Sequence, residues 1–378
     1  MLLEQILIIV VLYKPSDNDL KQVIGNIKSN FLVLIIDNSE QSHIHHFDRF
    51  LNVVYKHFKQ NIGLSDAYNY GIDFCLANQK KFMWIMDQDS DFSHTPIQDL
   101  DHIILTNQIE LIGCAILGLR PVSSMEELKV KWSQDFTWDE VLLSSGSIIN
   151  VEIAKRLKGF DSRIFIDTVD CEYAFRVMQN GYKILRINNL TFVHNIGTPT
   201  NLRYADMCLM SYKHSPLRRY YMVRNNLLMN EIYSNSDNQY IKNTLQYSMK
   251  TWVFEQLRLI NYEDNRLLKY YYCLLGKFHY NTKVFGQIPE HFLVYSNQDV
   301  VDALLQNRDL CRFFIEYLVA VESMVNSEIK LLNDVINRSS FDSLKHKIPP
   351  TSWFKRIKQL YCKFVKQILP QKNPLSPK

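Results

Sequence analysis

The sequence predicts an α/β fold, in which a mostly parallel sheet with flanking helices is followed by a helical C-terminal region. Strand-like and helix-like stretches alternate over roughly the first 200 of the 378 residues, and such alternation is typical of parallel sheets. From about Pro216 onward glycine is rare, and long aromatic-rich segments show helical spacing. The composition, 47% hydrophobic and 22% charged, is that of a globular protein and excludes a disordered chain.

The first half of the predicted sheet consists of short apolar runs. Unbroken aliphatic and β-branched runs are expected of strands that are buried on both faces. The four runs are Ile6–Leu12, Leu32–Ile36, Val53–Tyr55 and Phe82–Met86. Helical spacing between them predicts a helix over 17–27 and, after a loop, another within 61–78.

A second group of elements leads out of the sheet. Strands are expected over 111–118, 141–149, 182–187 and 191–194. A helix is expected over 168–180, because Gly181 stops the helical spacing there. We therefore expect a sheet domain over 1–230, a helical region over 231–344 and a basic tail over 345–378.

The charge balance and the cysteines exclude several classes of protein. Lys and Arg number 43 against 39 Asp and Glu, and the net charge of +4 is too small for a dedicated nucleic-acid binder. The seven cysteines include no C-x-x-C pair, which favours reduced core thiols in a cytosolic protein. No signal-peptide pattern opens the chain, and its longest apolar run, 6–13, is far below the ~20 residues of a membrane-spanning helix. We expect a cytoplasmic protein or one on a membrane surface.

The tail over 345–378 differs from the rest of the chain, with nine Lys or Arg and no Asp or Glu. Apolar residues recur there at three- or four-residue spacing, at Trp353, Ile357, Leu360, Phe364 and Ile368. A helix with one apolar face and a basic opposite face can lie in the interface of an anionic bilayer. The alternative is a solvated terminal helix packed on its own domain.

Two carboxylates directly follow the fourth predicted strand, at Asp87 and Asp89. Ligands of open α/β sheets bind beyond the carboxyl ends of the strands, and paired carboxylates suit Mg²⁺ or Mn²⁺ with substrate phosphates. The alternative is a turn whose carboxylates cap a helix from Ser93 onward. His194, at the end of a predicted strand, is a reasonable third ligand, although a lone histidine is more often structural.

A second acidic cluster opens the helix expected over 168–180. Asp170, Glu172 and Arg176 fall on its first turns, where a carboxylate can act as a general base on a hydroxyl. The alternative is acidic capping of the helix N-terminus with an i,i+4 pair between Glu172 and Arg176. The segment 61–71 lacks the spacing of a phosphate-binding loop, but its small residues would let backbone approach a ligand or a neighbouring strand.

Taken in order, these segments resemble the inverting family-2 glycosyltransferases of the GT-A fold. The matching segments are Val11–Pro15, Asp37–Ser39, Asn61–Gly71, Trp84–Ser90, Ser145–Ser147, Gly159–Asp161, Asp167–Asp170 and His194–Gly197. The Asp-Gln-Asp-Ser form, with Arg218–Asn225 downstream, is most similar to the rhamnosyltransferase branch, which builds bacterial surface polysaccharides and lies close to galactofuranosyltransferases. The resemblance fades after about Gly286.

The resemblance implies a role for each matched position. Asp170 would be the catalytic base, although Val169 stands where many relatives have Glu, and Asp167 is an alternative base. Asp87, Asp89 and His194 would hold a divalent cation, Mg²⁺ or Mn²⁺. The nucleotide-sugar would contact residues of the strand ends and their loops, namely Tyr13, Pro15, Asp37, Asn38, Asn61, Gly63, Asn69, Asp87 and Gly146.

The implied reaction is sugar transfer with inversion, in which residues 1–230 form the catalytic domain. The donor implied first is dTDP-rhamnose, giving L-rhamnose transfer to a saccharide or a lipid-linked glycan. The alternative is a galactofuranosyl or hexosyl transferase that uses a UDP-sugar. A lipid-linked acceptor fits a cytoplasmic protein held at the inner face of the plasma membrane by the basic tail.

Two alternative functions lie outside the transferases. A phosphatase of the haloacid-dehalogenase type also has Asp-x-Asp after an apolar strand, but Thr or Val usually follows there, whereas Ser90 follows here. A membrane adaptor with a degenerate transferase fold would be expected to have lost Asp89 or Asp170, and both are present.

Overall fold

The computed structural model describes residues 3–27, 31–107, 111–124, 126–194, 200–204, 207–211, 213–248, 260, 263–314 and 316. The chain divides into two compact units, one of Met1–Thr200 with Tyr212–Leu293 and one of Asn201–Ser211 with Val294–Lys378. The basic tail over 345–378 lies outside the described residues. The three-part division expected from the sequence stays a prediction.

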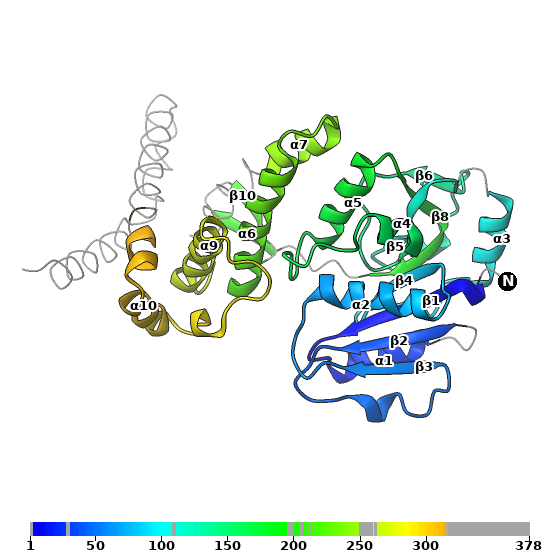
Figure 1. The fold of residues 1–378 in the computed structure, drawn as a ribbon, viewed down its shortest axis with the longest axis horizontal. Coiled ribbons are helices and arrows are strands. Elements are labelled where there is room, and N and C mark those ends of the chain that lie inside the picture. The colour runs from blue at the N-terminus through cyan, green and yellow to red at the C-terminus, as the bar shows by residue number, and fades with distance from the viewer. Residues whose placement is uncertain are drawn as a thin grey trace, which may run out of the picture. The chain divides into compact units, whose positions relative to one another are not determined.

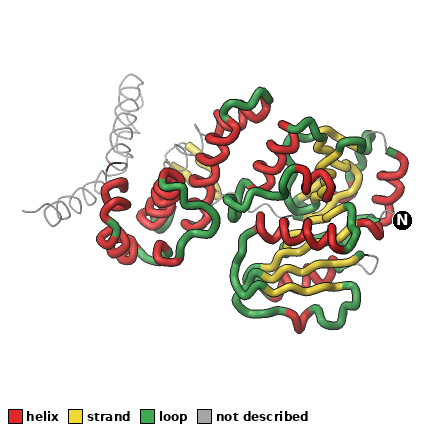
Figure 2. Tube along the Cα trace, viewed as in Figure 1, coloured by secondary structure: helices red, strands yellow, loops and turns green. Residues whose placement is uncertain are grey.

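An eight-stranded sheet forms the centre of the first unit (Figures 1 and 2). Its spatial order is β3-β2-β1-β4-β7-β5-β8-β6. The strands are β1 (Ile6–Leu12), β2 (Leu32–Asp37), β3 (Val53–His57), β4 (Phe82–Asp87), β5 (Cys114–Val122), β6 (Phe136–Trp138), β7 (Ser147–Asn150) and β8 (Lys183–Val193). Only β7 and β6 run antiparallel to their neighbours. The predicted mostly parallel α/β sheet is confirmed.

The register of the sheet places the acidic strand ends along one edge. Leu12 of β1 pairs with Asp37 of β2, and Val11 pairs with Asp87 of β4. Parallel strands end at the same edge of a sheet, so these two carboxylates lie on either side of the end of β1. The acidic strand ends therefore lie at one edge of the sheet, as the sequence predicted.

Helices cover both faces of the sheet (Figure 1). On one face the core contains side chains of α2 (Leu64–Ala77), α4 (Val151–Arg156) and α5 (Val169–Gln179). On the other it contains side chains of α1 (Asp17–Asn26) and α3 (Gln98–Thr106). Burial of both faces explains why the central strands are continuous apolar runs.

Two predicted segments differ from the structure. The strand expected over 141–149 is formed only from Ser147 on, because Gly146 takes a positive φ of 83° that ends the preceding loop. The strands expected over 182–187 and 191–194 are one strand, β8. Its register with β5 jumps from Leu119↔Ile187 to Arg120↔Thr191, so residues 188–190 bulge out of the ladder.

The helical region after the sheet is built around buried polar groups. Its helices in the first unit are α6 (Pro216–Tyr233), α7 (Gln239–Tyr247) and α9 (Arg266–Asn281). Arg219 of α6 donates to both carboxylate oxygens of Glu263, at 2.7 and 2.6 Å, and Lys269 of α9 adds a bond of 2.8 Å. The predicted helical character is confirmed for this part.

The second unit, by itself, contains a two-stranded sheet, β9 (Thr200–Tyr204) with β10 (Met207–Ser211), and the helix α10 (Asn297–Gln306). The sequence did not indicate the paired strands. Over the described part of the chain, no helix combines the length and the apolar composition that crossing a bilayer requires.

Acidification is expected to destabilise the protein through His279 of α9. The imidazole is 1% exposed, and its Nδ1 lies 2.8 Å from the hydroxyl of Tyr220. Burial, with the charges of Arg224 and His291, lowers the pKa of His279 to about 4. Between pH ~6.5 and about 4 the imidazole of the unfolded chain is protonated, whereas that of the folded chain stays neutral. The free energy of unfolding therefore falls as the pH drops from about 6.5 toward 4.

Urea unfolding at pH 7 and pH 5 measures this effect. In His279→Gln the loss of unfolding free energy between the two pH values should be smaller than in wild type by about 2 kcal/mol. His45→Gln, which removes an exposed imidazole, is the matched control. Equal losses in wild type and His279→Gln would contradict the assignment.

Candidate active site

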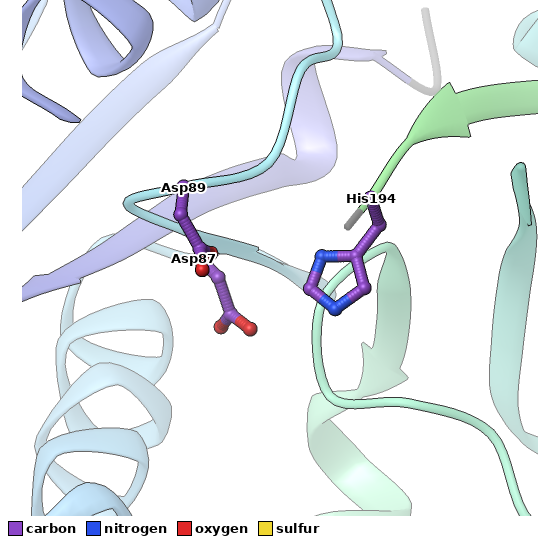
Figure 3. Close-up of side chains that lie close together, drawn as sticks. All are labelled: Asp87, Asp89 and His194. Atoms are coloured by element: carbon purple, nitrogen blue, oxygen red, sulfur yellow. The ribbon is translucent and has the colours of Figure 1, made fainter. Parts of the chain in front are cut away.

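Asp87, Asp89 and His194 converge at the carboxyl end of the sheet (Figure 3). The two carboxylates come from the end of β4 and the loop after it, and the imidazole follows β8. One ligand atom from each residue lies within 4.8 Å of the other two. The structure thus brings together the three predicted metal ligands, which are 107 positions apart in the chain from first to last (194 − 87).

A relay of hydroxyl groups orients the histidine. Nδ1 of His194 lies 2.8 Å from Oγ of Ser90, and this oxygen lies 2.8 Å from Oγ of Ser145. Oγ of Ser145 accepts a 3.0 Å hydrogen bond from the backbone N–H of Asp87. With Nδ1 engaged, Nε2 is the ring nitrogen left to bind a cation, which is the usual arrangement of a metal-ligating histidine.

Backbone pairing holds the two ligand-bearing loops together. Asp91 and Val193 exchange hydrogen bonds of 2.9 and 3.0 Å, and the N–H of His194 donates to the carbonyl of Val122 at 3.0 Å. The loop after β4 is therefore fixed to the ends of β5 and β8. This pairing fixes the ends of three strands around the site, which is how a binding site is preorganised.

The electrostatics of the cluster favour a cation. Burial, and then the negative charges of Asp89 and Asp170, raise the pKa of Asp87 to about 7. Like-charged carboxylates raise one another's pKa, and a bound divalent cation removes this penalty. Two carboxylates and an imidazole are a donor set that fits Mg²⁺ or Mn²⁺.

Asp170 lies in the first turn of α5, beside this cluster. Burial raises the pKa of Asp170, and its Oδ1 accepts a 2.9 Å hydrogen bond from the N–H of Cys171. The buried hydroxyl of Tyr68 has its pKa raised by burial and by the charges of Asp87 and Asp170, so it lies near both acids. A carboxylate with a raised pKa and a partly exposed surface is suited to accept a proton.

Asp167, the alternative base, has a different environment. Its Oδ1 accepts a 3.0 Å hydrogen bond from Nε of Arg218, and its side chain is 10% exposed. Asp167 and Thr168 both take left-handed backbone conformations, with φ of 60° and 59°. Such conformations cost about 1–2 kcal/mol per residue, so neighbouring contacts must hold them.

Helix α6 supplies those contacts. The side-chain amide of Asn225 donates to the carbonyls of Ile166 and Asp167, at 2.7 and 3.1 Å. Nη2 of Arg224 donates to the carbonyl of Arg163 at 3.3 Å. The segment Arg218–Asn225, used above only as a mark of resemblance, therefore supports the loop that carries Asp167 and Asp170.

Asp37 is buried, and both of its oxygens are occupied within the protein. Oδ1 accepts from the N–H of Ser39 at 2.9 Å, and Oδ2 is shared by the backbone and Nδ1 of His43 and by the hydroxyl of Tyr55. Burial would raise the pKa of Asp37, but these hydrogen bonds outweigh it and lower the pKa. Asp37 therefore organises its own loop, and its contact with a nucleotide base stays a prediction.

Asn38, Asn61 and Gly63 form one small assembly. The amide of Asn38 donates to Oδ1 of Asn61 and to the carbonyl of Gly63, both at 3.3 Å. Gly63 has a φ of 84°, and a Cβ there would lie 2.7 Å from the carbonyl oxygen of Phe165. The predicted close approach is thus to the loop before α5, which links the start of α2 to the region of the base.

Asn69 and Gly146 have structural partners. Asn69 accepts from the N–H of Phe160 at 2.7 Å and donates to its carbonyl at 2.9 Å. A Cβ on Gly146 would lie 2.4 Å from the ring of Phe192. Both residues fix loops around the cluster, and their contacts with a nucleotide-sugar stay predictions.

The turn after β1 is attached to the cluster by Gln88. Its Oε1 accepts from the N–H of Tyr13 at 2.9 Å, and Ser39 accepts from the N–H of Lys14 at 2.9 Å. Tyr13 is 44% exposed, and Pro15 is partly buried. Gln88, Ser90 and Ser145 were not assigned roles from the sequence, although two of them lie in the Asp-Gln-Asp-Ser segment.

No family model matches the chain. A curated relative from Shigella flexneri, named dTDP-rhamnosyl transferase RfbF, is 26% identical over 237 residues, which cover 58% of this chain and 78% of the relative. Among solved structures, S. aureus TarS aligns with a TM-score of 0.42 and 13% identity over 74% of this chain and 53% of TarS. TarS 1–349 in complex with UDP-GlcNAc aligns with a TM-score of 0.41 and 13% identity, over 74% of this chain and 88% of that one.

The relationship to the Shigella flexneri protein rests on sequence, as do the motifs and their order. The α/β sheet provides the arrangement in which those motifs meet at one edge. The resemblance to rhamnosyltransferase-like glycosyltransferases is thereby confirmed: over 58% of its length this chain is similar in sequence to a protein named dTDP-rhamnosyl transferase.

Proposed function

We propose that this protein is an inverting glycosyltransferase that moves a sugar from a nucleotide donor to a saccharide or a lipid-linked glycan. One observation supports the proposal: three side chains that could hold a cation, Asp87, Asp89 and His194, lie beside Asp170, an acid whose pKa burial raises. The first group suits a diphosphate with its cation, and the second suits removal of a proton from a hydroxyl.

The chemistry divides between these two groups. A sugar hydroxyl is a weak nucleophile, and Asp170 takes its proton as the oxygen attacks the anomeric carbon. The bond to the nucleoside diphosphate breaks in the same displacement, so the anomeric configuration inverts. A divalent cation bound by Asp87, Asp89 and His194 would stabilise the negative charge of the leaving diphosphate.

For the donor we propose dTDP-rhamnose. The support is the name of the Shigella flexneri relative, together with the Asp-Gln-Asp-Ser segment and Arg218–Asn225. The second candidate is a UDP-sugar, which would make the protein a galactofuranosyl or hexosyl transferase. The residues around the sugar itself, rather than the cation site, decide between these donors.

Release of free nucleotide tests the proposal. The purified protein is incubated with dTDP-rhamnose, UDP-galactofuranose or UDP-GlcNAc, each with Mg²⁺ and with Mn²⁺, in the presence of membrane lipid extract as a source of acceptor. Metal-dependent release of dTDP would support rhamnose transfer, and release of UDP would support the second candidate. Release of neither nucleotide would contradict a transferase and would favour the adaptor.

We also propose that the protein works at the inner face of the plasma membrane through the segment 345–378, on the evidence of its basic and apolar pattern. Deletion of this segment should reduce co-sedimentation with vesicles containing anionic lipid, because single basic residues near such a surface contribute about 1 kcal/mol each. Deletion should leave nucleotide binding unchanged. Equal co-sedimentation of the full chain and the deletion variant would reject the membrane role of the tail.

A further inference from the structure

The guanidinium of Arg120 packs on the exposed ring of Trp132, and neither residue is part of the Asp87-Asp89-His194 cluster. Trp132 is 46% exposed, and the guanidinium carbon of Arg120, on β5, lies 3.9 Å from the centre of its ring. Nη2 of Arg120 also donates to Oδ1 of Asn188. We call Trp132 and Arg120, with Asn188 and Asn189 beneath them, the Trp132 platform.

The platform is rigidly built on the bulge of β8. The side-chain amide of Asn189 accepts from the N–H of Trp132 at 2.9 Å and donates to the carbonyl of Trp132 at 3.1 Å. These two hydrogen bonds fix the backbone of Trp132. Asn188, which is 1% exposed, donates to the hydroxyl of Thr137 at 2.7 Å and to the carbonyl of Gln134 at 2.9 Å. Bulges commonly re-aim side chains near functional sites, and here the bulge fixes an apolar ring toward solvent.

The charge of Arg120 has no acidic partner within ion-pair distance among the residues that the structure describes. Its Nε is buried without a hydrogen-bond partner. The nearby acid, Asp139, is already bridged by Arg186. Burying part of a cation without a counter-charge costs folding free energy. The paired N–H groups of a guanidinium can donate two parallel hydrogen bonds to a carboxylate or a phosphate.

The platform shares its sheet face with α5 and Asp170. Gly118 of β5 faces Leu142, which belongs to the core cluster that contains the buried side chains of α5. Arg120 is two residues further along the strand and therefore points to the same face. Two residues beyond it, the carbonyl of Val122 accepts from the N–H of His194. Successive strand residues rise about 3.3 Å, so the backbone of Arg120 lies only about 7 Å along β5 from the residue that pairs with His194.

We propose that the Trp132 platform is an acceptor subsite for a saccharide that carries an anionic group. The ring of Trp132 offers a flat apolar surface against which the C–H face of a sugar ring packs, and Arg120 binds the anionic group next to it. The anionic group is a uronate carboxylate or a sugar phosphate, since both match the guanidinium. The inference rests on the proposed transferase function and names the chemical class of its acceptor.

Binding of small saccharides tests the proposal directly. The full-length protein is titrated with a hyaluronan tetrasaccharide, with N-acetylglucosamine 1-phosphate and with neutral chitotetraose. The variants are Trp132→Ala and Arg120→Gln. The matched control is Trp138→Ala, since Trp138 is 65% exposed with Nζ of Lys183 at 5.5 Å from its ring centre, but it lies on β6 outside the platform.

We expect at least one anionic probe to bind wild type more tightly than chitotetraose does, and to lose tenfold or more in both platform variants but not in Trp138→Ala. The probe that binds identifies the carboxylate or the phosphate as the anionic group. Equal binding of chitotetraose, wild-type binding by both platform variants, or no binding of any probe would overturn the proposal. Thermal unfolding of each variant reports whether it is folded.

Two further measurements separate this proposal from the transferase function: nucleotide binding by the variants and nucleotide release by wild type. In Trp132→Ala and Arg120→Gln, binding of dTDP and UDP should equal that of wild type, because neither residue is among those predicted to contact the donor. A wild-type protein that binds the anionic probe through the platform but releases no nucleotide would leave a saccharide site without transfer. Nucleotide release with no platform-dependent saccharide binding would leave the transferase and remove the subsite.

Discussion

Replacing Asp170 by Asn is expected to abolish sugar transfer while leaving nucleotide binding nearly intact. General-base catalysis contributes about 100- to 10,000-fold to a rate, and Asn cannot accept the proton of the attacking hydroxyl. The carboxylate acts on the acceptor, whereas the donor's diphosphate is expected at Asp87, Asp89 and His194. Turnover with saturating donor measures the first effect, and calorimetry with dTDP and UDP measures the second.

Asp167→Asn is the matched control, because the two acids lie three residues apart and flank the same turn. Asp167 is paired with Arg218 at 3.0 Å, so its replacement should weaken the support of the loop and lower the rate less than Asp170→Asn does. A larger loss in Asp167→Asn would reverse the assignment of the base. Equal loss of transfer and of nucleotide binding in Asp170→Asn would reject a role limited to the acceptor.

Replacing Glu263 by Gln is expected to cost the largest amount of stability, about 3–5 kcal/mol of unfolding free energy. The Glu263 side chain is 0% exposed and bridges Arg219 and Lys269, whose side chains are 2% and 8% exposed. Without its charge, the two buried cations lose the carboxylate that both of them bind. Urea unfolding of wild type and variant at pH 7 measures the difference.

Glu231→Gln is the control for this effect. Glu231 pairs with Lys283 at 2.7 Å, but both side chains are largely solvated, at 45% and 57% exposure. Exposed ion pairs contribute roughly 0–1 kcal/mol, so this variant should unfold almost as wild type does. A Glu263→Gln variant of similar stability would show that the buried triad is not what holds α6 against α9.

The central strands could be predicted because burial on both faces makes β1, β2 and β4 uniform apolar runs. The start of β7 was misplaced because the apolar residues of the segment 141–149 begin at Val141, whereas the turn at Gly146 decides where the strand starts. The bulge of β8 could not be foreseen, because Asn188 and Asn189 look like ordinary turn residues. Their partners, Arg120 and Trp132, lie 68 and 57 positions away.

For the site, local sequence indicated the chemistry of Asp87, Asp89, Asp170 and His194, but not the contacts that orient them. The relay through Ser90 and Ser145 depends on two loops that are 55 positions apart meeting at the sheet edge. The support from Asn225 depends on α6 packing against the loop before α5. Long-range contacts of this kind leave no periodic pattern in the sequence.

Calorimetric titration of dTDP and UDP, with and without Mg²⁺ or Mn²⁺, tests the central claim most directly when wild type is compared with Asp89→Ala. Asp73→Ala, which removes an exposed carboxylate from α2, is the control. We expect metal-dependent nucleotide binding that weakens at least about tenfold in Asp89→Ala and is unchanged in Asp73→Ala. Nucleotide binding that is independent of metal and equal in all three proteins would contradict the cation site, and no binding of either nucleotide would contradict the glycosyltransferase.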